Sequence, residues 1–432
     1  MTDITPASQV ALLTRPPAPA AVAPQLSSGS VSLFRDGDWS SQKLELRIAD
    51  YAPGQRQTIP ASMMDAATYV AFNLPIGTVM TLMDNIQPVL AGKSVADLSF
   101  CGRSVDLVGT GKTEAVDLMA ANVNDCVSCF FWREVELTLG AIELFDDLNF
   151  AGNRNTVFLS EWNPGTLWPI TDWWLNDKIS SMRWKTLSDR QTAVLFENTD
   201  GSGAQYNNIK GWGDLKEVSN LPDVRFNDQA SSFRWDAIAP VKEIIAPFPI
   251  TAGSSSSSPG LTSIVEGTND SSLPLPVTVT LTNTKAQNVT VSTTDKHVAG
   301  ISSTLSLSAT AEVPGMSATA TFSVTVNYSY THSETSTTSE TKTVALSIAE
   351  TINAPPHCSY KASLLVNIGT LPPTLYHTTA ERWYTAPMTG AIADPLFNNW
   401  YKRIEPVTVS VGGSLASTTS VNMKSTPLRK VA

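Results

Sequence analysis

The clearest hydrophobic pattern of the chain lies on either side of Pro314-Gly315. From 305 to 313 the odd positions are apolar and the even positions carry Ser, Thr or Glu, which is the period-two alternation of a β-strand. From 316 to 324 the parity is inverted, and the even positions are apolar. A hairpin with Pro314-Gly315 at the centre of a type II turn keeps both apolar rows on one face, because Leu307 then faces Phe322. The pattern therefore predicts an amphipathic hairpin over about residues 301–328.

This hairpin has the length and polarity of a membrane-spanning β-structure. Each arm has 10 residues, and a transmembrane strand needs roughly 9–11. Glu312 is the only charged residue between 301 and 326, whereas the exposed face of an ordinary half-buried hairpin carries Lys or Glu. We therefore expect the hairpin to insert into a membrane. Its predicted lipid-facing and turn residues are Leu305, Leu307, Ala309, Ala311, Val313, Pro314, Gly315, Met316, Ala318, Ala320, Phe322 and Val324. The opposite, polar face of the hairpin carries Ser306, Ser308, Thr310, Glu312, Ser317, Thr319, Thr321 and Ser323.

The rest of the C-terminal half is also strand-like and rich in hydroxyl groups. Residues 251–350 contain 41 Ser and Thr, a bias that O-glycosylated disordered stalks share. The alternation at Val277-Thr278-Val279-Thr280 argues against a stalk, which has no reason to alternate. Five serines after Ala252-Gly253 have the composition of a flexible linker. We therefore expect a Ser-rich linker at 244–261 and a β-module at 262–432.

The N-terminal half contains a six-residue motif, the hexad, that occurs four times. Asn-Asp-x-x-Ser-Ser is found at 176–181 and 227–232, and each copy is followed by x-Arg-Trp. A third copy at 124–129 has Cys in place of the second Ser, and a degenerate fourth copy lies at 64–69. Successive copies are 60, 52 and 51 residues apart. This regular spacing predicts four β-units of Greek-key size.

Charge separates the two halves of the chain. The whole sequence has 29 basic and 39 acidic residues, a net charge of −10, whereas residues 241–432 hold 11 of each. The excess negative charge therefore lies in residues 1–240. An acidic module argues against nucleic acid as a partner and is compatible with bound cations.

Few residues point to catalysis or to membrane-spanning helices. All four histidines lie in the hydroxyl-rich half without a visible nucleophile or acid partner, so no enzymatic function is expected. Cys126 and Cys129 form a lone CxxC that could bind zinc or be redox-active, but no second CxxC or His pair accompanies it. No run of 18 apolar residues predicts a spanning helix. Residues 1–27, rich in Ala and Pro, are expected to form a disordered arm rather than a secretion signal.

The hexads resemble the calcium motif of the βγ-crystallins, Asn/Asp-Asn/Asp-x-x-Ser/Thr-Ser. Residues 28–240 are similar to two βγ-crystallin domains of two Greek keys each, which the resemblance places at 28–138 and 139–243. The resemblance also implies bound Ca²⁺ with ligands shared between the two motifs of a domain. Calcium takes six to eight oxygen ligands, which carboxylates, hydroxyls and carbonyls can supply. The alternative is that the Asp and Ser residues only close a turn. By resemblance, the ligands are Asp177, Lys178, Ser180, Asp228, Gln229 and Ser231 in the second domain, with Lys178 and Gln229 using their carbonyls, and Asp125 and Ser128 in the first.

Residues 262–425 resemble the pore-forming module of the aerolysin family. The likeness rests on long Ser/Thr-rich strands at 277–299 and 327–352 and on the amphipathic hairpin between them. The two resemblances together imply an all-β chain, with tandem Greek-key βγ-crystallin-like domains followed by an elongated antiparallel aerolysin-like module.

The second resemblance implies a β-barrel pore-forming toxin or defence protein. Such a protein is a soluble monomer that binds a target membrane, either directly or through a glycan or protein receptor. It then forms a homo-oligomer and inserts one hairpin per subunit, so the resemblance implies that the polar face of the hairpin, from Ser306 to Ser323, lines the pore lumen. The resemblance implies secretion or release, although no signal peptide is recognisable. The alternative is a non-lytic calcium-binding βγ-crystallin protein, structural or glycan-binding, with a β-stalk.

Overall fold

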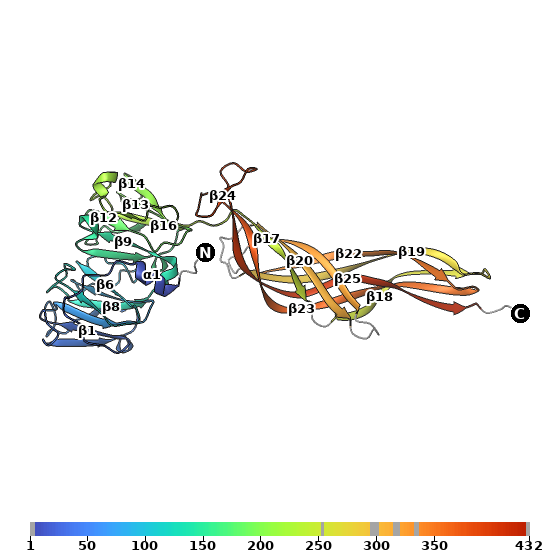
Figure 1. The fold of residues 1–432 in the computed structure, drawn as a ribbon, viewed down its shortest axis with the longest axis horizontal. Coiled ribbons are helices and arrows are strands. Elements are labelled where there is room, and N and C mark those ends of the chain that lie inside the picture. Colours follow the sequence, from blue (N-terminus) through green and yellow to red (C-terminus); the bar gives the residue numbers. More distant parts are fainter. Residues whose placement is uncertain (1–4, 252–254, 294–301, 314–319, 332–336, 429–432) are drawn as a thin grey trace. The chain divides into compact units, whose positions relative to one another are not determined.

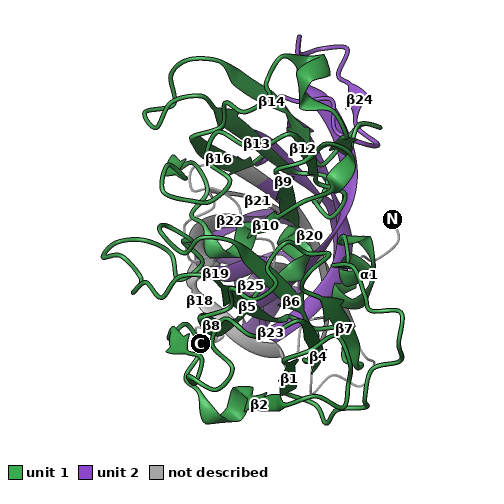
Figure 2. Cartoon of the chain, turned by 90° about the vertical axis from the view of Figure 1, so that its left-hand side faces the viewer, with its two compact units in different colours: residues 1–238 green, residues 239–432 purple. Residues whose placement is uncertain are grey.

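The structure is a computed structural model, and it describes residues 5–251, 255–293, 302–313, 320–331 and 337–428. Two compact units divide the chain, Met1–Ile238 and Ala239–Ala432 (Figure 2). Nearly all regular structure is β, so the all-β prediction is confirmed. Among the described residues, α1 (Pro6–Leu12) is the only α-helix, and no helix is long and apolar enough to cross a membrane.

The first half of unit 1 consists of two four-stranded antiparallel sheets that exchange strands. One sheet has the order β2-β1-β4-β7 and the other β3-β8-β5-β6. Each sheet therefore holds three strands of one key and one strand of the other, which is the interlocking of paired Greek keys. The strands are β1 (Ser30–Phe34), β2 (Lys43–Arg47), β3 (Gln57–Thr58), β4 (Tyr69–Asn73), β5 (Thr78–Met83), β6 (Ser104–Val108), β7 (Glu114–Asp117) and β8 (Cys129–Glu134).

The second half of unit 1 repeats this topology. Its sheets have the orders β10-β9-β12-β15 and β11-β16-β13-β14, so β11 and β15 again cross to the other sheet. Trp162, Trp173 and Trp184 are buried in its core. The strands are β9 (Ala141–Phe145), β10 (Arg154–Phe158), β11 (Trp168–Pro169), β12 (Ser181–Arg183), β13 (Gln191–Phe196), β14 (Gln205–Lys210), β15 (Glu217–Val218) and β16 (Ser232–Ala237).

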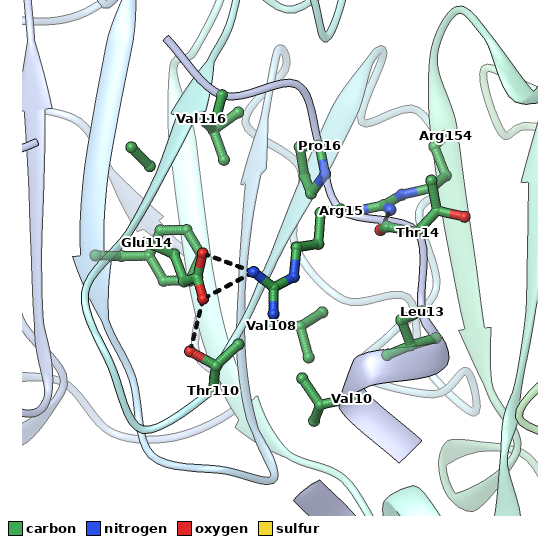
Figure 3. A pocket seen from close by; sticks show the side chains of 13 residues that line it. Val10, Leu13, Thr14, Arg15, Pro16, Val108, Thr110, Glu114, Val116 and Arg154 are labelled. Atoms are coloured by element: carbon green, nitrogen blue, oxygen red, sulfur yellow. Dashed lines mark hydrogen bonds and ion pairs between the residues drawn. The ribbon is translucent and has the colours of Figure 1, made fainter. Parts of the chain in front are cut away.

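The N-terminal arm is ordered from residue 5 onward, so the prediction of a disordered arm is wrong. Thr5 caps α1 by accepting a hydrogen bond from the Ser8 backbone N–H, and Pro6 occupies the first turn, where proline costs no hydrogen bond. Val10 and Leu13 are buried against residues of both β-domains (Figure 3). Their apolar partners are Val79, Val135, Leu137, Ala141 and Phe158.

Past the helix, the arm runs as an extended strap over a cavity of about 130 Å³. Arg15 forms an ion pair with Glu114 at 3.2 Å (Figure 3). The carbonyl of Pro17 accepts a hydrogen bond from the Asp117 backbone N–H at 2.8 Å. Composition did not predict this order because it comes from contacts with strands far along the chain.

Unit 2 is one sheet of long strands with the order β21-β20-β17-β23-β25-β19-β22 (Figure 1). In addition, β18 pairs with β23 and β24 pairs with β25. Two apolar clusters lie along the sheet, one around Leu305 and Val409 and the other around Leu281 and Leu364. The strands are β17 (Lys242–Thr251), β18 (Ser255–Asn269), β19 (Leu275–Thr293), β20 (Ser302–Val313), β21 (Ala320–Thr331), β22 (Thr337–Ala354), β23 (Cys358–Tyr384), β24 (Ile392–Ala393) and β25 (Tyr401–Pro427).

A buried ion-pair network joins three strands of unit 2. The Arg382 guanidinium on β23 lies 2.7 Å from Glu243 on β17 and 2.6 Å from Glu405 on β25. The Tyr384 hydroxyl donates a further hydrogen bond to Glu405 at 2.8 Å. These side chains are almost completely buried, so each charge depends on its partners for compensation.

The segment predicted as a Ser-rich linker at 244–261 largely forms strands. β17 pairs antiparallel with β23 and parallel with β20, and β18 pairs with β23 from Ser255 to Asn269. Residues 252–254 lie outside the described residues. A serine-rich backbone still has every N–H and C=O available, so a neighbouring strand can recruit it into a sheet.

The predicted hairpin is present as β20 and β21, but its register differs from the expected one. Leu307 pairs with Val326 and Val313 with Ala320, which shifts the pairing by four residues and excludes a two-residue turn at Pro314-Gly315. Residues 314–319 lie outside the described residues. Because the shift is even, apolar positions still oppose apolar positions along the ladder.

Candidate functional site

The two hexads of the second β-domain have the same backbone conformation. Asp177 and Asp228 both lie in the left-handed region with φ of 51°, a conformation that Asp adopts more readily than most residues. In each hexad the preceding Asn donates its side-chain N–H to the aspartate, from Asn176 to Asp177 at 2.8 Å and from Asn227 to Asp228 at 2.5 Å. Each hexad then leads directly into a strand, β12 or β16.

Side-chain oxygens from the two hexads meet across the domain. The Ser231 hydroxyl donates to Asp177 Oδ1 at 3.1 Å, and the Ser180 hydroxyl donates to Asp228 Oδ1 at 3.4 Å. The backbone repeats this exchange, because the Asp177 N–H donates to Ala230 and the Asp228 N–H to Ile179, both at 3.2 Å. The domain therefore carries two equivalent carboxylate–hydroxyl pairs, each made from both hexads.

This donor set is compatible with calcium. The side-chain oxygens of Asn176, Asn227 and Gln229 are buried without a hydrogen-bond partner, and buried acceptors of this kind usually have one. Carboxylate, hydroxyl and amide oxygens are the hard ligands that calcium prefers. In the described part of the chain, no three His, Cys, Asp or Glu residues are grouped to hold a metal. A cation here would therefore need hydroxyl, amide or main-chain oxygens as well.

The first β-domain has one such pair in the described contacts, and it also joins two hexads. The Ser128 hydroxyl donates at 2.6 Å to Asp65, not to Asp125. Asp65 belongs to the degenerate hexad, yet its φ of 49° matches the other three hexad aspartates. In the degenerate hexad, Thr68 stands where the other three hexads have their first serine. Its hydroxyl donates to the Arg35 carbonyl and not to an aspartate of the other hexad. The sequence could have identified Asp65 as a site residue, because it occupies the second position of the degenerate hexad, where the other three copies also have Asp.

Cys126 and Cys129 do not have the lowered thiol pKa of a reactive pair. Burial raises the pKa of both thiols to about 11. The nearby carboxylate of Asp84 adds to this effect at Cys126. Both cysteines are free, and their thiols remain protonated at neutral pH.

The hairpin lies at one end of the unit 2 sheet order. β21 pairs with β20, and β20 pairs in parallel with β17. Glu312 pairs with Thr321 rather than with Ser317. Leu305 is fully buried in the core of the unit and Thr304 is exposed. The other predicted lipid-facing and lumen-facing side chains lie outside the described ones.

The strands from β19 through the hairpin to β25 correspond to a known family. Residues 275–429 match the model of the Clostridium epsilon toxin ETX/Bacillus mosquitocidal toxin MTX2 family. The chain therefore carries an ETX/MTX2 domain. This domain includes the whole hairpin and excludes both β-domains of unit 1. Among proteins with curated functions, none matches the sequence.

Solved structures resemble parts of the chain. The calcium complex of protein S is 18% identical, covers 48% of this chain and 98% of its own, and has a TM-score of 0.23. The parasporin-2 Bacillus thuringiensis toxin that recognises cancer cells is 14% identical, with 55% and 85% covered and a TM-score of 0.18. An aerolysin-like protein of Bombina maxima is 10% identical, with 41% and 91% covered and a TM-score of 0.17.

Proposed function

We propose that this protein is an aerolysin-type pore-forming toxin or defence protein that binds calcium. In this function the soluble chain binds a target membrane, forms a homo-oligomer and inserts the β20–β21 hairpin of each subunit into a β-barrel. The observation that carries the proposal is that the ETX/MTX2 match contains a whole hairpin of alternating apolar and hydroxyl residues with one charge.

The position of the hairpin supports its release from the soluble fold. β21 ends the sheet order, so a single ladder, between β20 and β17, links the hairpin to the rest of the described sheet. That ladder is parallel, and parallel pairing is slightly less stable per residue than antiparallel pairing. Extraction of the hairpin therefore breaks one ladder and leaves the pairing of β17 with β23 in place.

Dye release from liposomes tests insertion. Cysteines introduced at Ile250 and Ala309, which are partners across the β17–β20 ladder, should block release until a reductant is added. Cysteines at Leu307 and Val326, which are partners within the hairpin, should leave release unchanged. Equal release by both oxidised variants would refute extraction of the hairpin. Complete absence of release by the wild type, with calcium binding retained, would instead favour the non-lytic binding protein.

The alternation predicts opposite effects of charge at neighbouring positions. Leu307→Asp places a carboxylate on the proposed lipid face, at a cost of at most about 2–4 kcal/mol per subunit, and should reduce dye release strongly. Ser306→Asp places the same group on the proposed lumen face and should reduce it far less. Similar losses from both variants would contradict the assignment of faces.

Glu312 is proposed to form a ring of carboxylates in the pore lumen. Such rings select cations, and the mutual repulsion of close carboxylates raises some of their pKa values, so the selectivity should weaken as pH falls. Reversal potentials across a salt gradient should show cation preference in the wild type, and Glu312→Lys should shift it toward anions. Unchanged selectivity in Glu312→Gln would remove this residue from the constriction.

Calcium is proposed to bind at the two hexads of the second β-domain. The carboxylates of Asp177 and Asp228, the hydroxyls of Ser180 and Ser231, and main-chain carbonyls at Lys178 and Gln229 would hold it. Binding to the folded state alone stabilises by about 2.7 kcal/mol at a hundredfold excess over Kd. Calcium should therefore raise the melting temperature of the wild type and not of the double variant Asp177→Ala/Asp228→Ala. An equal rise in both proteins would refute this site.

A further inference from the structure

The segment 385–400 of unit 2, which we call the apolar loop, exposes large hydrophobic side chains. It connects β23 to β25 and includes the short strand β24 (Figure 1). Ile392 is 75% exposed, Leu396 84% and Phe397 41%. Scattered exposed apolar residues are normal on protein surfaces. Three within six residues of one loop form a cluster, and such clusters are typical of interaction sites.

The Asp394 carboxylate organises the backbone of the apolar loop. Asp394 Oδ1 accepts hydrogen bonds from the backbone N–H groups of Leu396 at 2.8 Å and Phe397 at 3.3 Å. Its other oxygen accepts from the Trp383 indole N–H, and this hydrogen bond is the largest cause that lowers the pKa of Asp394. The Asp394 N–H donates to the Trp400 carbonyl at 2.8 Å. The loop thus presents Ile392 and Leu396 from a prearranged turn.

Aromatic rings and lysine ammonium groups are grouped within and next to the apolar loop. Phe397 and Trp400 are stacked with ring centroids 4.8 Å apart. The Lys242 ammonium lies 5.3 Å from the centre of the Phe397 ring and 4.6 Å from that of Trp383. Lys402 lies 5.8 Å from the centre of the Trp383 ring. Lys242 and Lys402 are half-buried, and the Lys402 ammonium also lies 3.1 Å from the Glu381 carboxylate.

This combination of side chains is typical of a surface that binds lipid. Aliphatic side chains enter the acyl region, aromatic rings favour the interface, and lysine ammonium groups reach the headgroup phosphates. Asp394 is the only charged residue in the apolar loop, and its carboxylate is already engaged by three N–H donors. A stable protein–protein interface needs about 800 Å² and roughly 20–30 residues per partner, more than a protruding loop supplies. Charge and shape thus favour lipid over protein.

We propose that the apolar loop anchors the protein to phospholipid membranes by inserting Ile392 and Leu396, with Lys242 against the headgroups. This inference rests on the proposed function, since it names how the soluble chain first contacts its target membrane. It assigns this step to unit 2 and to a segment separate from the insertion hairpin.

Co-sedimentation of the full chain with sucrose-loaded vesicles of phosphatidylcholine and phosphatidylserine tests the anchor. Leu396→Ser should reduce the partition coefficient about tenfold, as expected for one buried leucine side chain. Ile392→Ser should act similarly, and Leu396→Met should retain most of the binding. Leu375→Ser changes a residue of β23 that is 62% exposed, and this matched control should bind like the wild type. Because Leu396 is so exposed, its substitution should leave the melting temperature unchanged.

Several outcomes would overturn the anchor. Wild-type protein that does not bind protein-free vesicles, or Leu396→Ser that binds as well as Leu375→Ser, would refute it. A change in oligomeric state of Leu396→Ser without lipid would assign the loop to contacts between copies instead. Vesicle binding and dye release separate failure of the anchor from failure of the pore proposal. If both proposals hold, Leu307→Asp should bind vesicles normally while its dye release is strongly reduced.

Discussion

The strap formed by the N-terminal arm allows a sharp test of how unit 1 is stabilised. Thr14 lies on this strap, and its backbone N–H and hydroxyl donate to the Glu143 carboxylate at 2.9 and 3.1 Å. The Arg183 guanidinium donates to the same hydroxyl at 2.6 Å. Glu143 is only 3% exposed, so any lost hydrogen bond is not replaced by bulk water. Thr14→Val keeps the size and shape of the side chain and removes the hydroxyl.

The expected destabilisation follows from the charge of the acceptor. A hydrogen bond to a charged group contributes about 1.5–3 kcal/mol to stability. Because Arg183 retains its 3.2 Å ion pair with Glu217, the main loss is the hydrogen bond from the Thr14 hydroxyl to the Glu143 carboxylate. We expect about 2 kcal/mol, which corresponds to a melting temperature lower by roughly 4–8 °C for a unit of this size.

The same substitution predicts a pH dependence with a defined sign. Burial raises the pKa of Glu143, while Arg154 and Thr14 act in the opposite direction. Loss of the Thr14 hydroxyl should raise this pKa further. A carboxyl group whose pKa is higher in the folded state binds its proton more tightly there, so folding gains stability as pH falls. The destabilisation by Thr14→Val should therefore shrink as pH is lowered from 7 toward 5.

Thermal unfolding followed by tryptophan fluorescence provides the assay, since nine of the 11 tryptophans lie in residues 1–240. Thr58→Val is the matched control, because Thr58 is exposed on β3 and substitutions at such positions usually change stability by less than about 0.5 kcal/mol. If Thr14→Val and Thr58→Val melt together, the strap does not stabilise unit 1 and the reasoning fails.

Two further predictions concern unit 2 and the cysteines. Arg382→Met removes the buried ion-pair partner of Glu243 and should destabilise unit 2 by about 3–5 kcal/mol. Lys361→Met breaks an exposed ion pair and should lower the stability by at most about 1 kcal/mol. Similar denaturant midpoints for the two variants would contradict the role of burial. Burial raises the pKa of the Cys126 and Cys129 thiols to about 11. Iodoacetamide at pH 8 should therefore modify both slowly in the folded chain and rapidly in urea. Fast modification of the folded protein would show that the thiols are accessible.

Sequence alone determined the features that repeat locally. The period-two alternation around Pro314 predicted β20 and β21, and the recurring hexads predicted the paired Greek keys of unit 1. The alternation arises because successive side chains of a strand point to opposite faces, one buried and one exposed. The hexads recur because each copy forms a turn that needs the same residues. Such constraints act within a few residues, so they can be read directly from the chain.

Tertiary structure decided every feature that depends on a distant partner. The even shift in the β20–β21 register left the hydrophobic pattern unchanged, so the sequence could not distinguish it from the predicted register. The arm became ordered because Val10 and Thr14 find partners more than 60 residues away, and the serine-rich segment became β18 because β23 supplies its hydrogen bonds. The pairing of Ser128 with Asp65 likewise needed the two keys to interlock. Composition describes what a segment would do in isolation, whereas packing against another segment supplies the burial and hydrogen bonds that determine its structure.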